Sequence, residues 1–203
     1  MLRPMPPPVT RLPIVGVMGS GSRPYVERAS ALGRWLAECG VHLLTGGGAG
    51  VMAAVSKSFY ETPHRSGLVI GILPCDESLE ESRDGGPKPK DGYPNPWVEI
   101  PVLTHLPLSG QRALDSDGGA ESMSRNHINV LSSDVIVALP GDAGTLDEVR
   151  LAVRYQRPVI AFIESDRELP GLPASVPISG TLEGVRTFVT TQLGLSAPQG
   201  KSF

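Results

Sequence analysis

The chain has 203 residues, with 18 Lys and Arg against 21 Asp and Glu, and so a formal net charge of −3. That length suits one domain with a core that needs no disulfide or structural metal, and the charge lacks the basic patch of a nucleic-acid-binding protein. No apolar run approaches the roughly 18 residues of a membrane span, and the two cysteines form no CxxC pair. These features predict a soluble, cytoplasmic protein of a reducing compartment, with no nucleic-acid or membrane partner.

Flexible segments are predicted at both ends of the chain and in one long loop. The first 13 residues carry five prolines and no apolar segment typical of a secretory signal peptide. Residues 1–11 and the small, polar tail 195–203 are therefore predicted to be flexible. A second stretch rich in proline and mixed charge predicts a long loop over residues 74–96, a length usual for lids and mobile segments. The simplest organisation is one domain over residues 12–194 that contains this loop.

Short apolar runs alternate with helical patterns along the rest of the chain. Strands are predicted at Leu12–Met18, Val41–Thr45, Gly67–Leu73, Trp97–Val102, Asp134–Leu139 and Pro158–Ile163. Helices are predicted at Pro24–Cys39, Val51–Tyr60, Met123–Leu131, Thr145–Tyr155 and Thr181–Leu193. The continuously apolar strands indicate a parallel sheet that is buried on both faces. The predicted fold class is therefore α/β, a doubly wound, Rossmann-like parallel sheet with helices on both faces.

Three glycine-rich turns follow three of these strands, at Gly19–Ser22, Gly46–Gly50 and Gly141–Gly144. Each leads into a helix N-terminus, where free N–H groups and the helix dipole attract anions. None matches the Walker A, GxGxxG or GxSxG motif. One such turn could be only a tight connection, but three at one sheet edge predict a shared pocket for a phosphate. Its predicted binding residues are Gly19, Ser20, Gly21, Ser22, Gly46, Gly47, Gly48, Gly141, Asp142, Ala143, Gly144 and Thr145.

Two charged residues belong to the same region of the predicted fold. Thr145 and Glu148 have the spacing of a capping box, so one interpretation is that Glu148 caps its own helix. The other places its carboxylate beside the phosphate, where it could act as a general base or nucleophile or stabilise an oxocarbenium ion. Arg125, near a helix start, is either an exposed charge or a phosphate ligand through its planar guanidinium group.

The remaining candidates for chemistry are histidines and aromatic residues. The four histidines lack the spacing of a metal site, so no metal is predicted, and His127 is expected on a helix surface. Tyr93 and Trp97 flank Pro94-Asn95-Pro96. They either pack the loop against the sheet or stack on a flat ring at the rim of the pocket.

One segment carries a resemblance to a known family. PGDAGTLDE at Pro140–Glu148 resembles the PGGxGTxxE motif of the LOG-like proteins, long mislabelled lysine decarboxylases, and Arg125 falls at the position of their upstream arginine. The GSGS turn and the LLTGGGAGVM and GLVIGILP segments also match, so the resemblance spans roughly residues 12–165. Within this superfamily, SRNHINVLSSDVIVAL at Ser124–Leu139 is most similar to the molybdenum cofactor carrier proteins.

The resemblance implies two alternative functions. Carrier proteins bind a phosphate-bearing pterin cofactor without known chemistry on it. By this likeness the chain binds a phosphorylated nucleotide-like or pterin-like ligand, with the molybdenum cofactor as a candidate ligand and no required cofactor. LOG enzymes instead hydrolyse the N-glycosidic bond of cytokinin riboside 5′-monophosphates. By that likeness it is a phosphoribohydrolase of such a monophosphate or AMP, with Arg125 and Glu148 as catalytic residues, and whether it is an enzyme stays open.

Two further expectations come from the comparison with the family. The resemblance implies a homodimer or larger homo-oligomer, with the helices Met123–Leu131 and Thr145–Tyr155 as candidate interfaces. This chain also departs from the family motif, because Asp142 stands where the motif has its second glycine. That substitution puts a carboxylate beside the predicted phosphate turn.

Overall fold

The computed structural model describes residues 11–74, 88–106 and 123–195. They form a seven-stranded sheet in the order β4-β3-β2-β1-β5-β6-β7, and all neighbouring strands are parallel. The strands are β1 (Ile14–Met18), β2 (His42–Thr45), β3 (Val69–Pro74), β4 (Ile100–Thr104), β5 (Val135–Ala138), β6 (Val159–Phe162) and β7 (Ile178–Ser179). The α-helices are α1 (Val26–Glu38), α2 (Val51–Tyr60), α3 (Arg125–Ser132), α4 (Ala143–Arg154) and α5 (Leu182–Leu193).

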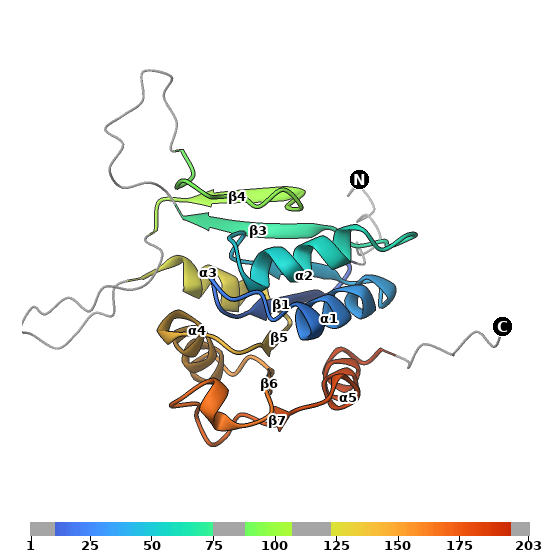
Figure 1. Cartoon of the computed structure of the whole chain (residues 1–203), viewed down its shortest axis with the longest axis vertical. Coiled ribbons are helices and arrows are strands. Elements are labelled where there is room, and N and C mark those ends of the chain that lie inside the picture. The colour runs from blue at the N-terminus through green and yellow to red at the C-terminus, as the bar shows by residue number, and fades with distance from the viewer. Residues whose placement is uncertain (1–10, 75–87, 107–122, 196–203) are drawn as a thin grey trace, which may run out of the picture.

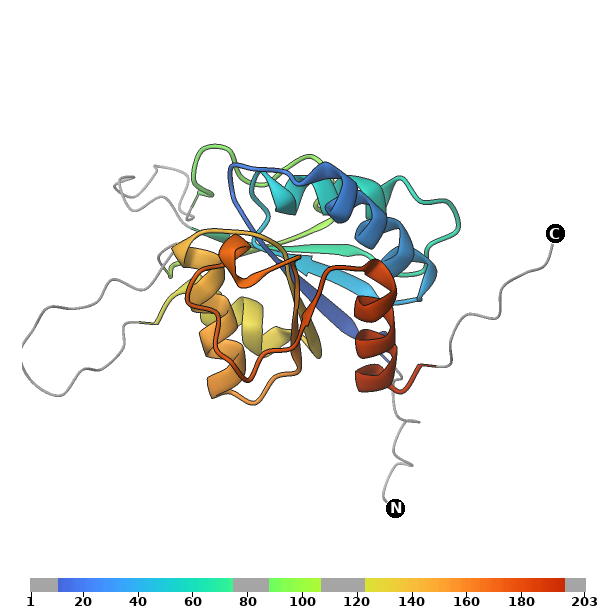
Figure 2. The same ribbon diagram turned by 60° about the horizontal axis from the view of Figure 1, so that its bottom comes forward.

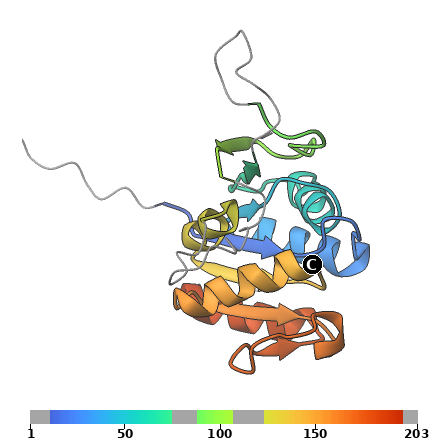
Figure 3. The ribbon, with the colours of Figure 1, turned by 90° about the vertical axis from the view of Figure 1, so that its left-hand side faces the viewer.

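Helices cover both faces of the sheet. Val15 and Val17 of β1 belong to a core with α1, α2 and α5. Met18 of β1 and Ile136 of β5 belong to a second core, with α3 and α4 on the opposite face. Figure 1 shows the strands descending from β4 to β7 between these layers, and Figures 2 and 3 show α3 and α4 side by side. The predicted doubly wound parallel sheet is confirmed.

The order in which the chain adds strands to the sheet reverses at the central strand β1. The chain adds β2, β3 and β4 on one side of β1, and then returns to place β5 on the other side. After β1 the chain turns to α1 on one face, whereas after β5 it turns to α4 on the other. The two loops are joined where the Ser20 N–H donates a hydrogen bond to the Pro140 carbonyl oxygen at 3.1 Å. Loops that diverge in this way leave a crevice at the carboxyl ends of the strands.

The main differences from the predictions are the start of one helix, the start of one strand and an additional strand. Helix α4 begins at Ala143, because Asp142 has the extended backbone of an N-cap and the next residues are already helical. Strand β4 begins at Ile100 because a turn precedes it, in which the Val98 N–H donates to the Asn95 carbonyl oxygen at 3.2 Å. Strand β7 was not predicted, since two residues are too short to show a period.

Only part of the predicted loop and ends can be described. Of the loop 74–96, Pro74 closes β3, residues 75–87 lie outside the described residues, and residues 88–96 are described. The predicted flexible ends, 1–11 and 195–203, lie outside the described residues except for Arg11 and Leu195.

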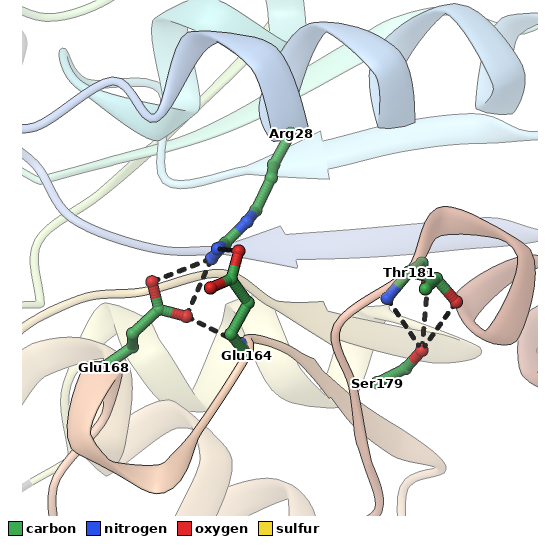
Figure 4. A network of polar contacts seen from close by, with 5 residues as sticks. All are labelled: Arg28, Glu164, Glu168, Ser179 and Thr181. Atoms are coloured by element: carbon green, nitrogen blue, oxygen red, sulfur yellow. Dashed lines mark hydrogen bonds and ion pairs between the residues drawn. The ribbon is translucent and has the colours of Figure 1, made fainter.

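An ion-pair cluster joins α1 to the segment after β6. Arg28 of α1 donates to both Glu168 carboxylate oxygens at 2.8 and 3.0 Å and to Glu164 at 2.7 Å (Figure 4). Figure 4 also shows a separate, local contact, in which the Ser179 hydroxyl donates to the Thr181 carbonyl oxygen at 2.9 Å, just before α5 begins. The Arg28 contacts hold the segment after β6 against the N-terminal end of α1.

Candidate functional site

A cavity of about 670 Å³ opens at the carboxyl ends of β1 and β5. It is lined by Val17, Met18, Gly19, Ser20, Gly21, Gly46, Met52, Tyr93, Arg125, Asn126, Asp142, Ala143, Gly144, Thr145, Leu146, Asp147, Glu148 and Arg150. The structure thus brings most of the predicted site residues, including Arg125 and Glu148, to one place. Four predicted residues are not part of the lining, namely Ser22, Gly47, Gly48 and Gly141.

The first two glycine turns use many of their N–H groups internally. The Ser22 and Arg23 N–H groups donate to the Ser20 hydroxyl oxygen at 3.3 and 3.1 Å. The Gly47 N–H donates to the Thr45 hydroxyl oxygen at 3.1 Å, and the Val51 N–H at the start of α2 donates to the Ser20 carbonyl oxygen at 2.9 Å. These internal hydrogen bonds take up part of the N–H groups of the two turns.

The N-terminus of α4 forms part of the cavity wall. The N–H groups of Ala143, Gly144 and Thr145 have no partner among the described residues, as is usual for a first helical turn. The exposed Asp142 side chain makes no capping hydrogen bond to them. Gly141 brings this turn close to the loop after β1, because a Cβ there would lie 3.1 Å from the Ser20 nitrogen. The α4 N-terminus thus presents three backbone donors without partners among the described residues, an arrangement that suits an anion.

Arg125 is the first residue of α3 and is 6% exposed, so the interpretation as an exposed helix charge is wrong. Its Nη1 donates to the carbonyl oxygens of Gly46 and Ile72, the latter at 3.0 Å. A Cβ at Gly46 would lie 2.6 Å from the same Nη1, so a side chain at this position would displace the guanidinium group. The Nε of Arg125 is buried without a hydrogen-bond partner among the described residues. Backbone carbonyls thus hold the guanidinium group in the cavity wall.

Glu148 is also buried, at 8% exposure. The capping-box interpretation is wrong, since the N-cap of α4 is Asp142 and Glu148 Oε1 accepts a hydrogen bond from Asn129 Nδ2 at 2.7 Å. Burial raises the pKa of the Glu148 carboxyl from its usual 4.5 to about 7. The Asn129 hydrogen bond and the charge of Arg125 act in the opposite direction, and the charge of Asp147 adds to the rise. A carboxyl group of this kind can gain or lose a proton near neutral pH.

Sequence reasoning missed the partners of these two residues. Asn129 lies one helical turn after Arg125, so the i, i+4 spacing placed it on the same face of α3. Its Oδ1 is buried without a partner among the described residues. His127 is buried rather than on the surface, because its Nδ1 accepts a hydrogen bond from the Ser124 N–H at 3.2 Å and closes the start of α3.

In the described parts of the chain, no three His, Cys, Asp or Glu residues are grouped so that they could hold a metal ion. Among the described helices, none has the length and apolar character that crossing a membrane requires.

Comparison with known proteins identifies the family. Residues 12–174 match the SLOG cluster4 family, and the chain belongs to it, which confirms the predicted LOG-like resemblance. The molybdenum cofactor binding protein from Rippkaea orientalis is 30% identical, with a TM-score of 0.66 over 90% of this chain and 98% of that one. The molybdenum cofactor carrier protein from Chlamydomonas reinhardtii is 30% identical, with a TM-score of 0.60 over 91% and 99%. An uncharacterized protein of Archaeoglobus fulgidus is 26% identical over 88% of this chain and 89% of its own length.

The raised pKa of Glu148 makes stability depend on pH. The native state holds this proton more tightly than the unfolded chain, so the contribution of Glu148 to stability falls as the pH rises from about 4.5 to about 7. The fall amounts to at most about 3 kcal/mol. We expect Glu148→Gln to increase the free energy of unfolding at pH 8 and to change it much less at pH 4.5, as measured by urea denaturation.

The exposed Glu183 of α5 supplies the matched control, and Glu183→Gln should show no such pH-dependent difference. If Glu148→Gln lowered the free energy of unfolding more at pH 8 than at pH 4.5, the result would contradict the account in which burial disfavours the ionised Glu148 carboxylate.

Proposed function

We propose that the chain binds a phosphorylated pterin-like or nucleotide-like ligand in this cavity, with the molybdenum cofactor as the foremost candidate. The observation that carries the proposal is the uncapped N-terminus of α4, which opens into the same cavity as the buried Arg125. The N–H groups and the helix dipole suit a phosphate group, and a volume of about 670 Å³ is in the usual range for small-molecule sites. Two structural neighbours that bind or carry the molybdenum cofactor support the choice of ligand.

A second function, hydrolysis of a nucleoside 5′-monophosphate, is favoured by the position of Glu148. From Gly144 to Glu148 the helix rises about 6 Å, which is comparable to the span of a ribose between its phosphate and its glycosidic carbon. A phosphate at the N-terminus of α4 would then place the sugar beside the buried carboxyl group. With a pKa of about 7, Glu148 suits general acid–base chemistry or stabilisation of an oxocarbenium ion.

The expected homo-oligomer has support on the surface of α3 and α4. Met123, just before α3, is 58% exposed, Leu131 of α3 is 42% exposed and Val153 of α4 is 38% exposed. We propose that these apolar side chains belong to a contact between copies of the chain.

Calorimetric titration with inorganic phosphate, AMP and an oxidised phosphorylated pterin tests the proposed binding. We expect the phosphorylated ring compounds to bind more tightly than phosphate alone, because they add contacts in the same cavity. Chromatography of the AMP mixture separates the two functions: released adenine indicates a hydrolase, and intact AMP a carrier. Glu148→Gln is the control, since it should abolish hydrolysis and preserve binding. If none of the three compounds bound, the proposed function would be rejected.

Asp142 should weaken the binding of phosphate. Its carboxylate is exposed at the rim of the cavity and precedes the first turn of α4. Like-charge repulsion at short range opposes a dianion there, so Asp142→Gly should tighten AMP binding by roughly 1–2 kcal/mol at low salt. The gain should shrink as salt is added, because exposed charges are screened.

Asp166→Asn, in the exposed 3-10 helix Asp166–Glu168, changes the net charge equally and serves as the control. Equal affinities of the Asp142→Gly variant and the unmodified protein at two salt concentrations would show that the Asp142 carboxylate does not act on the phosphate.

A further inference from the structure

Tyr93 occupies a special place in the cavity wall. It lines the main cavity and also a second one of about 400 Å³, whose other walls include Ala53, Pro94, Pro96 and Trp97. The two cavities thus have Tyr93 as a common wall residue. The walls beyond Tyr93 are largely apolar, unlike the backbone donors at the N-terminus of α4.

The chain holds Tyr93 in place through Asn95, which is 6% exposed. The Asn95 N–H donates to the Gly47 carbonyl oxygen at 2.8 Å, and its Nδ2 donates to the Gly48 carbonyl oxygen at 2.9 Å. Its Oδ1 accepts from the Trp97 N–H at 3.2 Å. Tyr93 is therefore anchored to the loop after β2 rather than carried on a free segment.

The glycines of that loop make room for side chains. A Cβ at Gly48 would lie 2.8 Å from Tyr93 Cε1 and 2.9 Å from the Met52 methyl carbon. Tyr93 and Met52 thus approach the same glycine, and both line the main cavity. On another side of the loop, Gly46 accommodates the guanidinium group of Arg125. The close approach of these side chains gives Gly46 and Gly48 a structural role, and the phosphate contacts expected of them from the sequence stay a prediction.

Arg125 also contacts the aromatic ring directly. Its Cζ lies 5.4 Å from the centroid of the Tyr93 ring, within the range of a cation–π interaction. The ring is partly buried, so it is ordered without being sealed from the cavity. A flat, polarisable surface formed by Tyr93 and the Met52 thioether is the kind of wall that heteroaromatic rings contact.

We infer that Tyr93, with Met52, is the specificity-determining contact for a planar heteroaromatic ring of the ligand, whose phosphate group binds at the N-terminus of α4. This inference rests on the proposed function, because it divides the same ligand into two ends. Stacking is tolerant of the aromatic ring's identity, so the surface accepts a purine or a pterin and discriminates against a sugar phosphate that lacks an aromatic ring.

The test compares ring compounds, meaning ligands with a heteroaromatic ring, with a ligand that has no such ring. Calorimetry would give the affinities of AMP, an oxidised phosphorylated pterin and ribose 5-phosphate for the unmodified protein and for the Tyr93→Leu and Tyr93→Phe variants. We expect Tyr93→Leu to weaken binding of the ring compounds about tenfold, and to change the affinity for ribose 5-phosphate less than about twofold. Tyr93→Phe keeps the ring and should retain most of the affinity.

Tyr60→Leu is the matched control. Tyr60 also lies under an arginine, with Arg65 Cζ 4.9 Å from its ring centroid, but it is exposed on α2 outside the cavity. This variant should leave all three affinities unchanged. Thermal denaturation of each variant shows whether it is folded.

The outcomes separate the inference from the function on which it rests. Equal losses for ribose 5-phosphate and AMP in Tyr93→Leu would mean that Tyr93 acts only by holding Arg125, and would overturn the ring contact. Unchanged affinities for the ring compounds would overturn it as well. If the unmodified protein bound none of the three compounds, the proposed function would fail and the inference with it.

Discussion

The site depends on one topological constraint, the reversal of strand order at β1. Since β2 and β5 flank β1 on opposite sides, the loops after β1 and β5 must run to opposite faces of the sheet. The hydrogen bond from Ser20 to Pro140 keeps them together at their start. Beyond it they separate, and the cavity and the free N-terminus of α4 lie where they do so.

The second determinant of the site is the way in which two charges are buried. Within the described residues, Arg125 and Glu148 form no ion pair with each other, and neutral groups contact each of them. The partners of Arg125 are backbone carbonyls and a tyrosine ring, and the partner of Glu148 is an amide. Neutral partners compensate a buried charge less than an opposite charge does, so each group keeps a capacity to interact with a ligand. The same reasoning explains why the pKa of Glu148 rises.

The sequence was a good guide to the fold, because continuously apolar strands and amphipathic helices are local signals. It also located the carboxyl-edge pocket, through glycines that follow strands, as at Gly19 and Gly144. It misled where a local pattern competed with a distant contact. Thr145 and Glu148 matched a capping box, yet the Glu148 carboxylate accepts a hydrogen bond from Asn129, 19 residues earlier.

The role of the second glycine turn could not be predicted for the same reason. Gly46 and Gly48 give space to Arg125 and Tyr93, which lie far along the chain and reach this loop only in the folded sheet. Likewise, Asn95 had no sequence signal, since its partners are the carbonyl groups of Gly47 and Gly48. Contacts of this kind follow from the tertiary arrangement and have no period or motif.

A crystal structure of the protein with AMP would test the central claim most directly. The account predicts that the phosphate oxygens lie within about 3 Å of the N–H groups of Ala143, Gly144 and Thr145. A phosphate bound instead at the loop Gly46–Gly48, or at the amino ends of the strands, would contradict it.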